Sequence, residues 1–156
     1  MIRYLKYSVF TVLCLTIVQV FAQAPETSFV GTWELLSIEE RTDTGHWIPA
    51  RRFSGNRPFG VLMYDVQGNM AVQITTDPRD TARSAERPEF INGYVAYYGT
   101  YEINAEDGTI THHRRSHVNA EVANLSVVRY FSFSDDALTL TVAPERSLRL
   151  IWRKAR

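Results

Sequence analysis

Short runs rich in valine, isoleucine, threonine, tyrosine and phenylalanine recur along most of the chain, and glycine, asparagine or aspartate closes each run. β-Branched and aromatic residues favour strands, and the small polar residues favour the turns between antiparallel neighbours. The pattern predicts eight strands, near residues 30–40, 59–65, 69–75, 94–104, 109–117, 126–134, 137–143 and 147–154. A weaker additional strand is expected at 46–49.

The turn signals between these runs are short enough for hairpins between sequence neighbours. They are Thr44-Gly45, Gln67-Gly68, Asp107-Gly108 and Asp135-Asp136. Eight such strands can stack as two sheets or close on themselves, and closure leaves no unpaired edge. We therefore predict an all-β fold, a closed eight-stranded antiparallel up-and-down barrel whose interior holds side chains or one small ligand.

The segment from Thr76 to Pro88 carries helical signals instead of strand signals. Thr76 or Asp77 could cap a helix, Pro78 suits its first turn, and arginine recurs at every fourth position. Because the segment has almost no apolar face, a solvated surface loop is the favoured interpretation. A mobile flap over an opening between strands is the functional alternative.

Apolar and polar residues alternate in the last two predicted strands, so successive side chains face opposite sides of the sheet. The residues expected to point inward are Leu138, Leu140, Val142, Leu148, Leu150 and Trp152. The threonines and arginines between them are expected to point outward. These strands therefore predict an apolar wall of the barrel.

The two strands around residues 105–108 carry polar groups on the face expected to point inward. A four-residue turn there places Tyr101 opposite His112 and Gly99 opposite Arg114, with Tyr97 on the same face. The opposite face is expected to face solvent. It carries Tyr94, Tyr98, Glu102, His113, Arg115 and His117.

Arg129, on the following strand, shares its face with Phe131 and Phe133. A buried guanidinium is costly without a partner, so it must meet a carboxylate, carbonyls, an aromatic ring or a ligand anion. One interpretation is a structural hydrogen bond to backbone carbonyls at the barrel end. The other is a site in which a few polar groups hold the head of an amphipathic molecule in an apolar cup. The candidate residues for this site are Arg129, Arg114, His112, Tyr101 and Tyr97.

Seventeen basic and seventeen acidic residues balance, which leaves no basic excess for nucleic acid. No phosphate-binding loop, dinucleotide fingerprint or nucleophile elbow occurs in the sequence, so a nucleophilic enzyme is not expected. On a strand His112 and His113 face opposite sides, and about 13 Å separates His113 from His117. We therefore expect no metal and no cofactor.

Proton transfer is harder to exclude, because His112 beside Tyr101 in a dry cavity has the right chemistry and reach. The preferred interpretation is that His112 hydrogen-bonds Tyr101 and fills space. One alternative is an isomerase or cyclase that uses His112 with Tyr97 or Tyr101 on a hydrophobic small molecule. Another is a filled structural barrel that binds protein partners, and the sequence does not indicate an oligomeric state.

The first 22 residues have the pattern of a secretory signal. Arg3 and Lys6 precede an uncharged, mostly apolar run of about 15 residues, shorter than the roughly 20 of a bilayer-spanning helix. Cleavage after Ala22 is expected to leave a domain of residues 23–156 without cysteine, since Cys14 is removed. We expect a secreted or periplasmic protein without stable membrane insertion.

The chain also resembles a known family. Gly31-Thr32-Trp33 is similar to the Gly-x-Trp opening of lipocalins, and five segments follow in order the motifs of the lipocalin-like domain family of bacterial and fungal proteins. These segments are 60–64, 68–74, 97–101, 111–113 and 150–152. The resemblance implies a calycin-type barrel that binds a small hydrophobic molecule. The Thr-Asp-Tyr motif and a cysteine pair are absent, so retinoid, haem or siderophore binding is not carried over.

Overall fold

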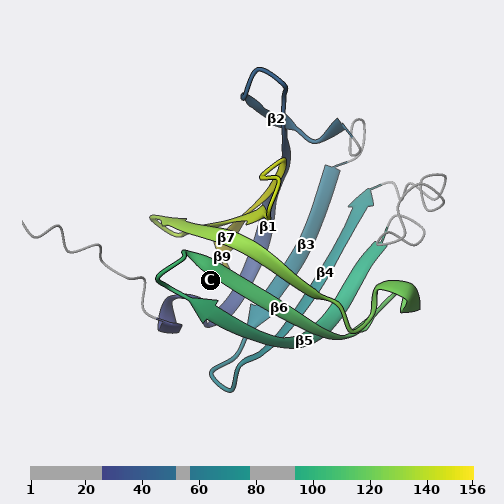
Figure 1. Cartoon of the computed structure of the whole chain (residues 1–156), viewed down its shortest axis with the longest axis vertical. Helices are drawn as coiled ribbons and strands as arrows, with labels where there is room; N and C mark the ends of the chain where they lie inside the picture. Colours follow the sequence, from purple (N-terminus) through teal and green to yellow (C-terminus); the bar gives the residue numbers. More distant parts are fainter. Residues whose placement is uncertain (1–25, 52–56, 78–93) are drawn as a thin grey trace, which may run out of the picture.

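The structure is a computed structural model that describes residues 26–51, 57–77 and 94–156 (Figure 1). The predicted signal segment lies outside these residues. Within them, nine strands and two short 3₁₀ turns, η1 (Glu26–Ser28) and η4 (Ala120–Val122), are found. The strands are β1 (Gly31–Arg41), β2 (Trp47–Pro49), β3 (Arg57–Tyr64), β4 (Asn69–Asp77), β5 (Tyr94–Asn104), β6 (Thr109–His117), β7 (Ser126–Ser134), β8 (Ala137–Val142) and β9 (Leu148–Lys154). No helix in the described ranges is long and apolar enough to cross a membrane.

Eight of these strands close into an antiparallel barrel. Neighbours in the sheet follow the order β1, β3, β4, β5, β6, β7, β8, β9, and β9 pairs back onto β1. The long β1 makes closure possible, because residues 31–34 pair with β3 while residues 33–40 pair with β9 across a bulge. The short β2 pairs only with the last residues of β1. The predicted closed up-and-down barrel is confirmed.

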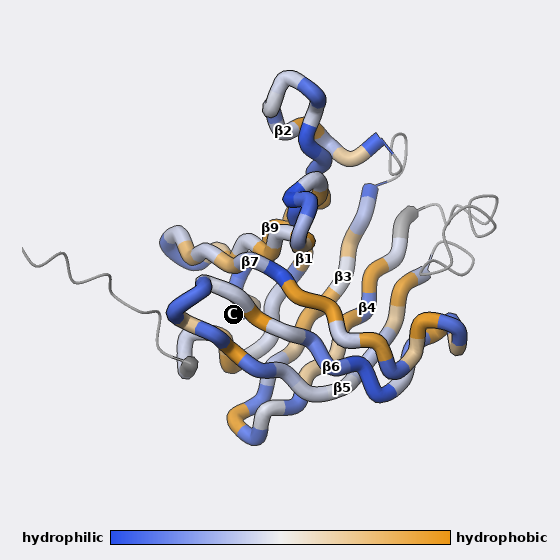
Figure 2. Tube along the Cα trace, in the orientation of Figure 1, coloured by the Kyte–Doolittle hydropathy of each residue, from blue (hydrophilic) through white to orange (hydrophobic). Residues whose placement is uncertain are grey.

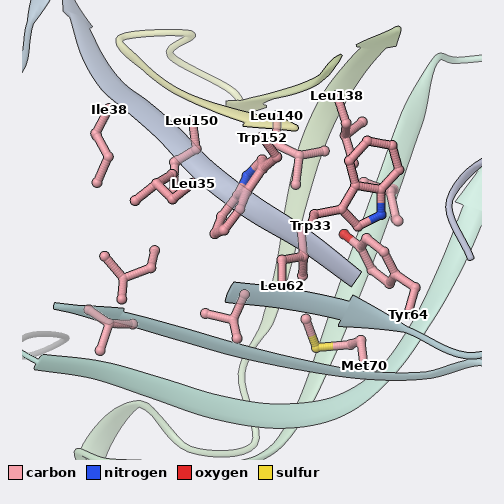
Figure 3. Packing of buried hydrophobic residues seen from close by; sticks show 14 of the residues in the cluster. Trp33, Leu35, Ile38, Leu62, Tyr64, Met70, Leu138, Leu140, Leu150 and Trp152 are labelled. Atoms are coloured by element: carbon pink, nitrogen blue, oxygen red, sulfur yellow. The ribbon is translucent and has the colours of Figure 1, made fainter. Parts of the chain in front are cut away.

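The interior wall follows the predicted alternation. Leu138 pairs with Trp152 and Leu140 pairs with Leu150 across β8 and β9, and all four side chains are buried. They meet Leu62 and Met70 of β3 and β4 in the barrel interior (Figure 3). Apolar and polar segments follow one another along the chain (Figure 2).

A β-bulge next to Gly99, where β5 pairs with β6, corrects the predicted orientation of one residue, His117. The predicted partners Tyr101–His112 and Gly99–Arg114 are present, but beyond them Tyr97 pairs with His117. The extra residue in β6 turns His117 inward, where it is only 8% exposed, so the prediction that it faces solvent is wrong. A Cβ at Gly99 would lie 1.9 Å from the carbonyl oxygen of His113, which explains the glycine at this point.

Strand β4 continues through Asp77, so Thr76 and Asp77 belong to a strand. The remainder of the predicted loop or flap, from residue 78 to Pro88, lies outside the described residues. The other strand boundaries fall within one or two residues of those predicted.

One end of the barrel is plugged by aromatic rings. Phe29, just after η1, is fully buried and its ring centroid lies 4.9 Å from that of Phe131 and 4.8 Å from that of Phe133, edge to face. The indole Nε1 of Trp33 donates a hydrogen bond of 2.8 Å to the carbonyl oxygen of Phe29. We call this end, with its β3–β4, β5–β6 and β7–β8 turns, the closed end. The rest of the interior is the open half.

Candidate functional site

The open half contains a cavity of about 940 Å³, to which all eight barrel strands contribute side chains. This volume lies within the range of pockets that enclose small organic ligands. Most of the lining is apolar. It includes Leu62, Val72, Ile74, Val95, Leu140, Leu150 and Trp152.

The charged groups around the cavity are mainly cationic. Arg41, Arg51, Arg114 and Arg129 line it, while Glu40 is its one acidic side chain in the described part of the chain. Glu40 forms an ion pair with Arg51. The charge balance of the cavity therefore favours an anionic guest over a cationic one.

Arg129 projects from the middle of β7, between Ile110 on β6 and Val142 on β8. Its side chain is half-buried and lines the cavity. Within residues 26–51, 57–77 and 94–156 the guanidinium has no hydrogen-bond, ion-pair or aromatic partner. The hydrogen bond to backbone carbonyls that the sequence left open is thus not formed with any described residue.

His112 is 1% exposed and lies between two tyrosine hydroxyls. Its Nε2 is 2.7 Å from Oη of Tyr64, and its Nδ1 is 3.1 Å from Oη of Tyr97. Burial, followed by the positive charges of Arg129 and Arg114, holds the pKa of His112 well below its ordinary value. The imidazole is therefore neutral near pH 7, and both of its nitrogens are already engaged.

Tyr64 is a member of this group that the sequence did not identify. It lies at the end of β3, and burial raises its pKa well above the ordinary value. Its inward position follows from the same alternation that places Leu62 inward, but its contact with His112 spans strands that are not neighbours in the sheet. Alternation predicts which face a residue occupies, and it does not predict contacts across the barrel.

Tyr101, which the sequence placed beside His112 as its partner, takes another position. Its ring packs 4.7 Å from that of Tyr64, and its hydroxyl donates a hydrogen bond of 2.9 Å to the carbonyl oxygen of Asp65. Tyr101 thus contributes to the closed end, and it is not among the residues that line the cavity.

Tyr97 joins the remaining polar groups. The guanidinium of Arg114 lies over its ring at 5.5 Å, and the ring of His117 stacks on it at 5.7 Å. Arg114 also donates from Nε to the carbonyl oxygen of Leu125, which fixes the guanidinium against the loop after β6. Of the five predicted residues, the structure brings Arg129, Arg114, His112 and Tyr97 to the cavity.

In the described part of the chain, no three His, Cys, Asp or Glu side chains are grouped so that they could hold a metal ion. Neither ring nitrogen of His112 is available as a ligand, since each contacts a tyrosine hydroxyl. The chemistry that this site offers is hydrogen bonding and charge in an apolar surrounding.

A family model described as a lipocalin-like domain matches residues 30–155. No curated protein matches the chain. Among solved structures, a de novo designed fluorescence-activating β-barrel is 10% identical, with a TM-score of 0.43, and the match covers 83% of this chain and 95% of that one. A redesigned β-barrel is 10% identical, with a TM-score of 0.41, and the match covers 83% of this chain and 94% of that one. The fatty acid transporter REP1-NXSQ is 11% identical, with a TM-score of 0.40, over 83% of this chain and 98% of that one. With TM-scores this low, the fold assignment rests on the strand pairing and the family match.

Proposed function

Since the chain belongs to the lipocalin-like domain family, we propose that it binds a small hydrophobic or amphipathic molecule inside its barrel. The size and apolar lining of the cavity support this proposal. They weigh against the filled structural barrel, which would leave no such space. Both nitrogens of His112 are engaged by tyrosine hydroxyls, and its lowered pKa makes it a weak base, which weighs against an isomerase or cyclase that uses it as acid or base.

One observation carries the proposal, namely the cation of Arg129 in an apolar cavity without a partner among the described residues. A half-buried charge of this kind lowers stability unless something compensates it. An anionic or polar head group on an otherwise apolar ligand would do so, and its tail would lie along the leucines and valines of the wall.

Titration with the fluorescent carboxylate dansylaminoundecanoic acid tests this function. We expect binding to the native protein, and Arg129→Met should weaken it about tenfold or more, since a hydrogen bond to a charged group is lost. Arg153→Met is the matched control, because Arg153 lies on the outer face and pairs with Glu34. The affinity of the Arg153→Met protein for the probe should be unchanged.

Three results would count against the proposal: no binding of the probe by the native protein, binding by the Arg129→Met protein that is as tight as by the native one, or failure of the Arg129→Met protein to fold. The last result would indicate a structural role for Arg129, and circular dichroism of the variant detects it directly.

We further propose that the barrel acts outside the cytoplasm, as a secreted or periplasmic carrier. The pattern of the first 22 residues supports this, with two basic residues followed by an uncharged apolar run. Amino-terminal sequencing of protein exported by its own host should start at Gln23. A full-length chain found inside the cell would contradict export.

A further inference from the structure

The number of protons shared by His112 and its two tyrosines is fixed. A neutral imidazole carries one N–H, so one ring nitrogen donates a hydrogen bond and the other accepts one. One tyrosine hydroxyl therefore gives its proton to His112. The other accepts from His112 and keeps its own proton, and neither hydroxyl has a second partner among the described residues.

Burial identifies the tyrosine with the spare proton. The contacts of 2.7 Å from Tyr64 Oη to Nε2 and 3.1 Å from Tyr97 Oη to Nδ1 are both hydrogen bonds, and the imidazole tautomer sets their directions. Tyr64 is buried and is not part of the cavity lining, so a spare proton there would be a buried donor without an acceptor. Tyr97 lines the cavity, where a guest molecule can accept its proton.

His112 also links Tyr97 to Arg129. Tyr97 contacts the imidazole directly, and Arg129 pairs with Ile110, which lies two residues before His112 on the same inward face of β6. Tyr97, His112 and Arg129 line the same cavity. The hydroxyl of Tyr97 and the guanidinium of Arg129 are thus two donors near one buried histidine, and neither has an acceptor among the described residues.

We propose that the hydroxyl of Tyr97 and the guanidinium of Arg129 together bind a carboxylate, so that the ligand is an amphipathic monocarboxylic acid. This inference rests on the proposed binding function and adds the chemistry of the head group. A carboxylate accepts hydrogen bonds and donates none, which matches two donors. An alcohol would bring a donor that finds no acceptor at Arg129, and an ammonium group would be repelled by Arg129 and Arg114.

Isothermal titration with dodecanoate and 1-dodecanol, which share a tail and differ in the head group, tests the inference. The native protein should bind dodecanoate at least about tenfold more tightly than dodecanol. Tyr97→Phe keeps the ring that stacks on His117, and it should weaken dodecanoate about tenfold while changing dodecanol less than about twofold. Tyr98→Phe is the matched control, because Tyr98 is the next residue on β5 and faces solvent, 57% exposed. Neither affinity should change in that variant.

Each other outcome is decisive. Equal loss for both probes in Tyr97→Phe would mean a structural role, and no loss would mean that the hydroxyl does not contact the head group. Either result overturns the inference. If Tyr97→Phe does not fold, the native protein still decides, since equal affinity for dodecanoate and dodecanol would overturn the carboxylate head group while leaving ligand binding intact. Failure of the native protein to bind either probe would instead contradict the proposed function itself.

Discussion

The closed end and the open half of the barrel are built from the same alternating strands, yet one is packed and the other is hollow. At the closed end the inward residues are large aromatic rings. Phe29 meets Phe131 edge to face, and the ring of Trp33 is tilted by 47° against that of Phe133. In the open half the inward residues are mostly valine, leucine and isoleucine. An eight-stranded barrel is wide enough either to be filled by side chains or to hold one small ligand, and in this half the aliphatic side chains leave a cavity.

The polar groups differ in the same way. At the closed end the indole of Trp33 donates to a carbonyl, and Lys154 donates to the carbonyl oxygens of Ser28 and Val30 while it covers the ring of Trp33. In the open half, Arg129 and the buried Nε1–H of Trp152 have no acceptor in the described chain. The difference supports the proposal that the closed end stabilises the barrel and that the open half holds a guest.

The largest expected effect is on core packing. Phe29→Ala should lower the free energy of unfolding by about 3–5 kcal/mol, because a fully buried ring that three other rings contact is lost. Val72→Ala, which only enlarges an existing cavity, should cost about 1–2 kcal/mol. Chemical denaturation measures both values, and equal losses would mean that the two regions are not packed differently.

The second effect is a pH dependence of stability. The pKa of His112 is lowered in the folded protein, whereas in the unfolded chain it has its ordinary value near 6.5. Below about pH 6.5 the unfolded chain therefore takes up a proton that the folded protein does not. Stability should therefore fall as pH decreases from about 6.5, by up to about 1.4 kcal/mol per pH unit. His112→Gln should remove this slope, whereas His46→Gln, in the exposed hairpin of β2, should keep it. The same slope in both variants would place the titration elsewhere.

The smallest effect compares the two cations. Lys154→Met should lower the stability of the unliganded protein by about 1 kcal/mol, because hydrogen bonds to two carbonyls are lost in a partly exposed setting. Arg129→Met should leave stability unchanged or raise it slightly, since it removes a charge without a partner from an apolar cavity. Thermal unfolding without ligand measures both. A larger loss in Arg129→Met than in Lys154→Met would reverse the assignment of roles.

Local sequence patterns were enough to predict most of the fold. Strand positions, hairpin turns and the inward set on β8 and β9 follow from alternation and turn chemistry, which act between residues close in sequence. The orientation of His117 could not be predicted in this way, because the bulge opposite Gly99 shifts the register by one residue. A single extra residue in a strand turns every later side chain to the other face.

The candidate site was predicted in part for the same reason. Arg129, Arg114 and Tyr97 have inward positions that alternation gives directly. The partner of His112 was predicted as Tyr101, its neighbour across one strand pair, whereas the hydroxyls that it contacts belong to Tyr97 and Tyr64. These contacts depend on the tilt of the strands and the curvature of the barrel, which a linear pattern does not encode.

Whether the open half carries a ligand is tested most directly by native mass spectrometry of the protein purified without detergent from its own host. We expect the native protein to retain one small molecule in a fraction of its population, and we expect the Arg129→Met protein to lose it. A native protein whose mass matches the bare chain, even after incubation with an organic extract of the host, would contradict a ligand-binding role for the cavity.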